Sequence, residues 1–171
     1  MRTLVLMRHA KTEPNHPMGD KARRLTMRGR SDAADVGRQL ADRAIDLVLC
    51  SSAERTRQTV EHLGLDARVE YMDVLYSGGV ETMLQRISEI DDEVTSLLVV
   101  GHSPTIPWLS SQLAAASAPR QADEIGCWFP TAAWTEFTLE GSWSDLHPDH
   151  FATDGAEQTR LVGLHRRDST P

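Results

Sequence analysis

The sequence of 171 residues is poor in cysteine, in aromatic side chains and in long apolar runs. Its two cysteines, Cys50 and Cys127, lie far apart in apolar surroundings, and we expect two buried free thiols rather than a disulfide. The longest apolar runs, at 3–7 and 96–100, are far shorter than the roughly 20 residues that a membrane-spanning helix needs. Only two residues precede the first run, a stretch too short for a signal peptide. We therefore expect a soluble, cytoplasmic protein that does not bind a membrane.

Basic residues are in the minority as well. The chain has 18 lysines and arginines against 25 aspartates and glutamates, which gives a formal net charge of −7. This balance argues against nucleic-acid binding, because neutralising phosphates requires a net basic surface. It also makes a local arginine cluster more informative, since a positive pocket on an acidic protein focuses anions. Apolar residues make up 40% of the chain, enough for a globular core, and the length suits one domain over residues 1–171.

Strand and helix patterns alternate over the first two-thirds of the chain. Short buried strands are predicted at 3–7, 45–50, 67–71 and 96–100. Helices are predicted at 27–44, 53–63, 82–90 and 104–116. The alternation favours an α/β fold, a three-layer αβα sandwich with a mostly parallel central sheet. Two further strands, expected to be antiparallel additions, are predicted at 127–129 and 133–139, and loops at 10–25 and 117–125. The pattern weakens after residue 140.

Charged and histidine side chains follow three of the predicted strands. Arg8 and His9 end the first strand, Arg55 lies shortly after the second, and His102 follows the strand at 96–100. The carboxyl ends of parallel strands gather at one edge of a sheet, so we expect these side chains to lie together. Arginine offers a planar charged fork that matches two phosphate oxygens, and a neutral histidine can accept a phosphoryl group. Such a set suits phosphoryl transfer, in which fixed positive donors meet the developing negative charge.

Three ordered motifs resemble those of the histidine phosphatase superfamily, also called phosphoglycerate-mutase-like. Residues 6–12 (LMRHAKT) resemble the RHG or RHA signature of that family. Residues 51–59 (SSAERTRQT) resemble its S-x-x-x-R-x-x-Q-T segment, and residues 99–104 (VVGHSP) its V-G-H-[SN]-P segment. The resemblance covers about residues 1–140 of this chain. It implies a phosphoglycerate-mutase-like fold and a phosphatase that works through a phosphohistidine intermediate.

The resemblance also implies roles for the residues at the strand ends. His9 would be the histidine that is phosphorylated, and His102 the second histidine of the pocket. Arg8, Arg55 and His102 would bind the substrate phosphate, and all three are expected to act in catalysis with His9. No cofactor is implied, and we expect activity without a metal, because two arginines and two histidines supply the positive field that Mg²⁺ gives other phosphoryl-transfer enzymes.

Two further features are similar to the small SixA-type phosphohistidine phosphatases. Ala10 stands where glycine is usual in the family, and Lys11 follows it. Residues 20–26 (DKARRLT) resemble D-x-x-R-P-L-[ST], with Arg24 in place of the proline. On this resemblance Arg23 would add a donor at the mouth of the pocket. The alternative for Arg23 is a solvated surface charge.

The proton donor of the larger branches has no counterpart here. Tyr76 stands where the mutase and acid-phosphatase branches carry a carboxylic acid, and we expect it to contact substrate. Glu81 lies nearby, but its place at a helix start is typical of a surface charge that the helix dipole favours. Without a donor, alkoxides should leave slowly and phosphohistidine or aryl phosphates readily. The predicted substrates are therefore phosphohistidine proteins or other phosphate compounds with good leaving groups.

Other interpretations remain. Within the same superfamily the chain could hydrolyse small-molecule phosphate esters, or it could bind phosphate without turnover. Residues 101–105 resemble the G-x-S-x-G elbow of acyl hydrolases, but Thr105 replaces its last glycine. Cys50 with Arg55 or Arg57 has the wrong spacing for a cysteine phosphatase loop. The cluster of His147, Asp149 and His150 is more typical of a surface loop than of a metal site.

Overall fold

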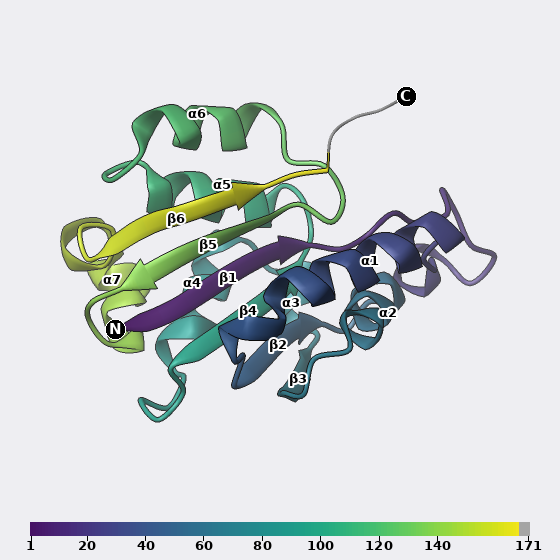
Figure 1. Ribbon diagram of the computed structural model, residues 1–171, viewed down its shortest axis with the longest axis horizontal. Helices are drawn as coiled ribbons and strands as arrows, with labels where there is room; N and C mark the ends of the chain where they lie inside the picture. The colour runs from purple at the N-terminus through teal and green to yellow at the C-terminus, as the bar shows by residue number, and fades with distance from the viewer. Residues whose placement is uncertain (168–171) are drawn as a thin grey trace.

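The computed structural model describes residues 1–167 and shows an α/β protein built on a six-stranded sheet (Figure 1). Its strands are β1 (Arg2–Arg8), β2 (Leu47–Ser51), β3 (Arg68–Met72), β4 (Ser96–Gly101), β5 (Trp134–Leu139) and β6 (Thr159–His165). They lie in the order β3-β2-β4-β1-β5-β6. The first four strands of this order are parallel, while β5 joins β1 and β6 joins β5 by antiparallel pairing. The predicted, mostly parallel sheet is confirmed.

Helices cover both faces of the sheet and complete the predicted αβα sandwich (Figure 1). One face packs against α1 (Met27–Leu40) and α2 (Glu54–Leu63). The other packs against α4 (Val80–Ser88), α5 (Thr105–Ala114) and α6 (Pro119–Cys127). The shorter helices are α3 (Val74–Ser77) and α7 (Pro148–His150). Within residues 1–167, no helix has both the length and the apolar character needed to cross a membrane.

The continuous apolar run of β1 follows from burial on both faces. Leu4 and Leu6 point to the core on the α4–α5 side, whereas Val5 and Met7 point to the core under α1 and α2. All four side chains are fully buried. Because successive side chains of a strand point to opposite faces, a central parallel strand needs apolar residues at every position. Burial on both faces therefore keeps β1 inside the sheet, and Arg8 lies at the carboxyl end of this strand.

Two glycines of α1 bring backbone segments close together. A Cβ at Gly37 would lie 1.9 Å from the carbonyl oxygen of Leu63, so α1 and α2 touch at this point. A Cβ at Gly29 would lie 2.1 Å from the carbonyl oxygen of Lys11. That same oxygen accepts a hydrogen bond from the Thr26 amide at 3.0 Å. The segment after β1 is thereby tied to the N-terminus of α1, and the loop at 10–25 is held beside the end of the sheet.

The chain after residue 116 differs from the predictions. The predicted loop at 117–125 is largely helix α6, whose first position is Pro119, and the predicted strand at 127–129 begins at the last residue of that helix. The second antiparallel strand is β6 instead, in a region where the sequence pattern is weak. Cys127 is exposed at the end of α6, so the prediction of two buried thiols holds for Cys50 alone. Both cysteines are free, as predicted.

Candidate active site

The carboxyl ends of β1, β2 and β4 meet at one cavity of about 560 Å³. In the register of β1 with β4, Arg8 lies opposite Gly101, so His9 and His102 leave the sheet side by side. Their ring centroids are 5.4 Å apart. Arg55 comes from the first turn of α2, directly after β2. Arg8, His9, Arg55 and His102 all line the cavity, so the structure brings together the groups that the sequence placed at strand ends.

His9 is held as a neutral imidazole. Its side chain is buried, and Nδ1 lies 2.8 Å from the carbonyl oxygen of Ala10. A carbonyl oxygen only accepts, so Nδ1 carries the proton and the lone pair is on Nε2. Burial is the main cause that lowers the pKa of His9 to about 3. The neighbouring His102, Arg55 and Arg8 contribute in the same direction, while the hydrogen bond to Ala10 opposes the shift. An unprotonated Nε2 is the form in which histidine acts as a nucleophile.

His102 is neutral as well. Burial, and then the charge of Arg55, lower its pKa to about 4, while Asp20 opposes the shift. Its Nε2 lies 2.7 Å from the hydroxyl oxygen of Ser51 at the end of β2. Its Nδ1 has no hydrogen-bond partner among the residues that the structure describes. His102 is therefore anchored by Ser51 at Nε2, while its Nδ1 is buried without a partner in residues 1–167.

Arg8 is oriented by the loop that precedes β5. Its Nη1 donates a 2.9 Å hydrogen bond to the carbonyl oxygen of Phe129. Burial lowers the pKa of the guanidinium, because desolvation disfavours the charged form. Arginine nevertheless stays charged in proteins, so Arg8 places a permanent positive charge beside His9.

Asp20 gathers three of the predicted substrate-binding side chains. Arg55 donates from Nη1 to the backbone oxygen of Asp20 at 2.9 Å and from Nη2 to its carboxylate at 3.2 Å. The Tyr76 hydroxyl donates to the same carboxylate at 2.8 Å, and Arg23 donates to it at 3.0 Å. The hydrogen bonds from Tyr76 and then Arg23 hold the pKa of Asp20 at about 2. Asp20 is the aspartate of the D-x-x-R segment, and the motif alone predicted no role for it.

The remaining predicted residues differ in whether they line the cavity. Arg23 lines the cavity, and its other donors reach the Glu13 carbonyl at 3.0 Å and the Thr12 hydroxyl at 2.7 Å, so it is not a solvated surface charge. Tyr76 does not line the cavity. Its hydroxyl donates to Asp20, and its ring meets the ring of His102 edge-on, with centroids 5.8 Å apart. Glu81 is exposed in the first turn of α4 and does not line the cavity.

The cavity also extends to residues that sequence reasoning left out. These are Lys11, Thr12, Arg28, Asp32, Ser103, Trp128, Pro130, Thr131 and Arg167. Lys11, Thr12 and Ser103 follow β1 and β4 closely. The others come from α1, from the loop before β5 and from the segment after β6, whose approach to the strand ends depends on tertiary packing. In residues 1–167 there is no group of three or more histidine, cysteine, aspartate or glutamate side chains placed to hold a metal ion.

Known proteins resemble this chain over nearly its whole length. A family model of the histidine phosphatase superfamily (branch 1) matches residues 4–76. An uncharacterized protein of Mycobacterium tuberculosis is 38% identical over 163 residues, covering 93% of this chain and 98% of the relative. A structure from Nakamurella multipartitia, provisionally described as the phosphohistidine phosphatase SixA, is 33% identical with a TM-score of 0.83 and covers 96% of this chain and 95% of its own. This chain belongs to the histidine phosphatase superfamily.

The superfamily's fold extends to a more distant structure. The protein histidine phosphatase SixA complexed with tungstate is 23% identical, with a TM-score of 0.72 and coverage of 95% of both chains. At this identity the likeness concerns the fold alone. The histidine phosphatase family, the phosphoglycerate-mutase-like fold and the SixA-type resemblance that the sequence predicted are all confirmed.

Proposed function

We propose that this histidine phosphatase superfamily member is a phosphatase that forms a phosphohistidine intermediate on His9. We further propose that it acts on phosphohistidine proteins or on other phosphate compounds with good leaving groups, without a metal. The observation that carries the proposal is the state of His9. A buried, neutral imidazole has its proton fixed on Nδ1 by the Ala10 carbonyl, in a cavity lined by Arg8, Arg55 and His102.

The geometry supports a two-step reaction. In the first step Nε2 of His9 attacks phosphorus, the bond from nitrogen to phosphorus forms and the bond to the leaving group breaks. In the second step water attacks the same phosphorus, releasing phosphate and the neutral imidazole. Arg8 and Arg55 stabilise the charge on the equatorial oxygens in both steps, the largest contribution in such reactions.

The substrate preference follows from the protonation of the acids near the cavity. Asp20 lies beside the cavity, and with a pKa of about 2 it is ionised and has no proton to give. Asp32, the carboxylate in the cavity wall, forms ion pairs with Arg28 and Arg167. The Tyr76 hydroxyl already donates to Asp20. Glu81 lies outside the cavity. A leaving group must therefore depart with little help, which favours a phosphohistidine nitrogen or a phenolate over an alkoxide.

The first experiment measures hydrolysis of an aryl phosphate by the wild type and by His9→Ala, with a chelator in the buffer. We expect His9→Ala to abolish turnover while circular dichroism shows an intact fold. His62→Ala, at the far end of α2, is the matched control and should retain activity. Turnover by His9→Ala that co-purifies with the protein would contradict the nucleophile assignment. Loss of wild-type activity in chelator, restored by a divalent cation, would contradict metal independence.

The same assay separates the candidate substrates. A phosphohistidine peptide and aryl phosphates of graded leaving-group pKa should be hydrolysed well, and serine phosphate poorly. Rates that do not depend on leaving-group pKa would instead support a small-molecule phosphate ester hydrolase with a proton donor. Phosphate binding without turnover of any substrate would support the binding module.

A further inference from the structure

The charge around the cavity exceeds what one phosphoryl group requires. Six of the lining residues are lysine or arginine and one, Asp32, is acidic, although the whole chain carries a net charge of −7. Three of the six cations, Arg8, Arg23 and Arg55, belong to the site described above. The other three are Lys11, Arg28 and Arg167. The cavity volume of about 560 Å³ falls in the range of sites that hold whole small molecules, roughly 300–1,000 Å³.

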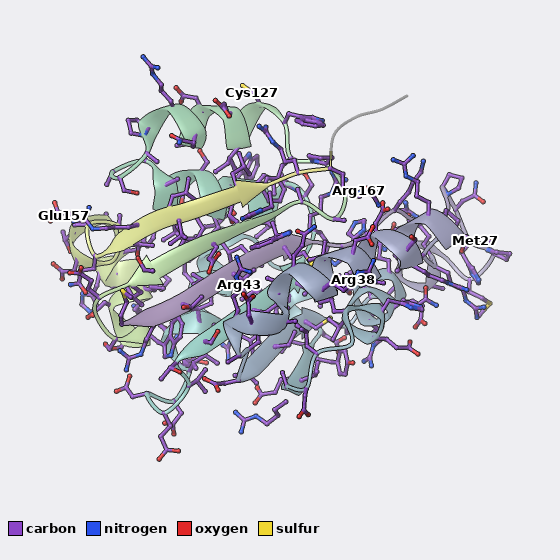
Figure 2. All side chains as sticks on the ribbon, viewed as in Figure 1. Met27, Arg38, Arg43, Cys127, Glu157 and Arg167 are labelled. Carbon is purple, nitrogen blue, oxygen red and sulfur yellow. The ribbon has the colours of Figure 1, made fainter. Side chains whose placement is uncertain are left out.

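Asp32 fixes two of these additional cations. Its side chain is only 5% exposed, and Arg28 lies one helical turn before it on α1, with Nε 3.9 Å from the carboxylate. Arg167 also forms an ion pair with Asp32, and its Nη1 lies 3.6 Å from Asp35. Figure 2 shows Arg167 just beyond the end of β6. Because a buried carboxylate requires partners, Asp32 holds both guanidinium groups at the cavity wall. Each guanidinium has five N–H donors, so donors remain for a ligand.

Lys11, the third additional cation, lies in the loop after β1. Its side chain is exposed and forms no ion pair with any residue in 1–167. Its backbone is tied to the start of α1, because its carbonyl oxygen accepts from the Thr26 amide. The first turn of α1 contains no acidic residue, so the positive end of this helix is uncompensated there. Three cations against two carboxylates, the buried Asp32 and the more exposed Asp35, leave this part of the wall positive.

We propose that Lys11, Arg28 and Arg167 form a second anion subsite, which takes an acidic group of the substrate beyond the transferred phosphoryl group. The inference rests on the proposed function and narrows its substrate class. The preferred substrate carries a second set of anionic oxygens, as a phosphate or a carboxylate, within reach of the phosphoryl group. Asp20 contacts Tyr76, Arg55 and Arg23, whereas the subsite adjoins α1, the loop before β5 and the end of β6.

Non-hydrolysable phosphonates test the subsite without turnover. Alkylphosphonates of increasing chain length end either in a hydroxyl, a carboxylate or a second phosphonate, and calorimetry in chelator gives their dissociation constants. The dissociation constant of the hydroxyl-terminated ligand, divided by that of the acid-terminated ligand, reports only the contact with the second subsite. At the best length we expect the acid-terminated ligand to bind about tenfold tighter, as one charge-assisted hydrogen bond provides. The carboxylate and phosphonate arms show which anion the subsite prefers.

Matched variants assign the effect to the subsite. In Lys11→Gln with Arg28→Gln the ratio should fall close to one. Arg30→Gln removes one positive charge from α1 at an exposed position outside the cavity, as Arg28→Gln does within it, and should keep the wild-type ratio. A wild-type ratio near one at every chain length, or an equal loss in Arg30→Gln, would overturn the subsite while leaving the phosphatase proposal standing. Failure of all phosphonates to bind would overturn both.

Discussion

At the residue scale, the proposed chemistry depends on keeping His9 unprotonated. Burial lowers the pKa of His9 to about 3 and that of His102 to about 4, both below the ordinary histidine value. The nucleophilic form is therefore fully present at neutral pH and decreases only when the pH falls toward these values. An NMR titration of the imidazole nitrogens should place the His9 midpoint well below pH 6.5. A midpoint near 6.5 would show that the imidazole is solvated and would contradict the burial argument.

The same shifts couple protonation to stability. The unfolded chain binds protons at histidines with a pKa near 6.5, whereas folded His9 and His102 bind them only near 3 and 4. Their contribution to stability is thus complete above about pH 6.5 and is lost as the pH falls through the folded values. Acid should therefore weaken the fold partly through the groups that serve the proposed reaction.

Arg55 and Arg57 provide a matched pair on one helix. Arg55 uses both terminal nitrogens of its fork on Asp20, whereas Arg57 is exposed and lies 4.2 Å from the ring centre of Tyr71. Lysine cannot reproduce a two-pronged contact. We expect Arg55→Lys to lower kcat/KM for an aryl phosphate by about a hundredfold to a thousandfold. Arg57→Lys should change kcat/KM little. Equal effects in the two variants would argue against a phosphate-binding role for Arg55.

Sequence reasoning located single residues where they follow a strand directly. His9 and His102 follow β1 and β4 without a gap, so predicting the strands also placed the side chains. Asp20 was missed because it lies in a loop, and its path back to the site depends on the contact between Lys11 and Gly29. That contact joins separate segments of the chain, so no local periodicity in the sequence predicts it.

At the element scale, Gly37 sets the distance between α1 and α2. A side chain there would meet the Leu63 carbonyl at 1.9 Å, so Gly37→Ala must push the helices apart. We expect a loss of about 1–3 kcal/mol in the free energy of unfolding, measured by urea denaturation. Gly126→Ala in α6 is the control, since its new Cβ meets nothing closer than 3.9 Å. It should be neutral or stabilise by up to about 1 kcal/mol. Equal changes in the free energy of unfolding for the two variants would contradict the close approach of α1 and α2.

The two elements that were not predicted, β6 and α6, have weak sequence patterns for physical reasons. β6 is an edge strand with one neighbour, its side chains are mostly half-exposed, and Gly163 interrupts it. Such a strand lacks the continuous apolar run that β1 and β4 show. The buried face of α6 consists of only Ala122 and Ile125, too narrow a stripe to outweigh its polar residues. Pro119 was the available signal, because proline favours the first turn of a helix.

At the scale of the whole molecule, an acidic protein surrounds a basic cavity. Six lysines and arginines line that cavity against one aspartate, so its field is opposite in sign to that of the rest of the surface. The Debye length falls from about 30 Å at 0.01 M salt to about 8 Å at 0.15 M, which screens this attraction for a phosphate dianion before it is bound.

We therefore expect kcat/KM for an aryl phosphate to fall several-fold between these two salt concentrations, roughly as far as steered association does in other enzymes. The value of kcat should change much less, because the bound phosphoryl group lies close to its arginines and is screened weakly. Chloride could also compete directly for the cavity, so the series is repeated with a bulkier monovalent anion at matched ionic strength. Equal curves for both salts would assign the effect to screening. A kcat/KM that does not change with salt would show that the cavity's charges are neutralised locally and attract no substrate from solution.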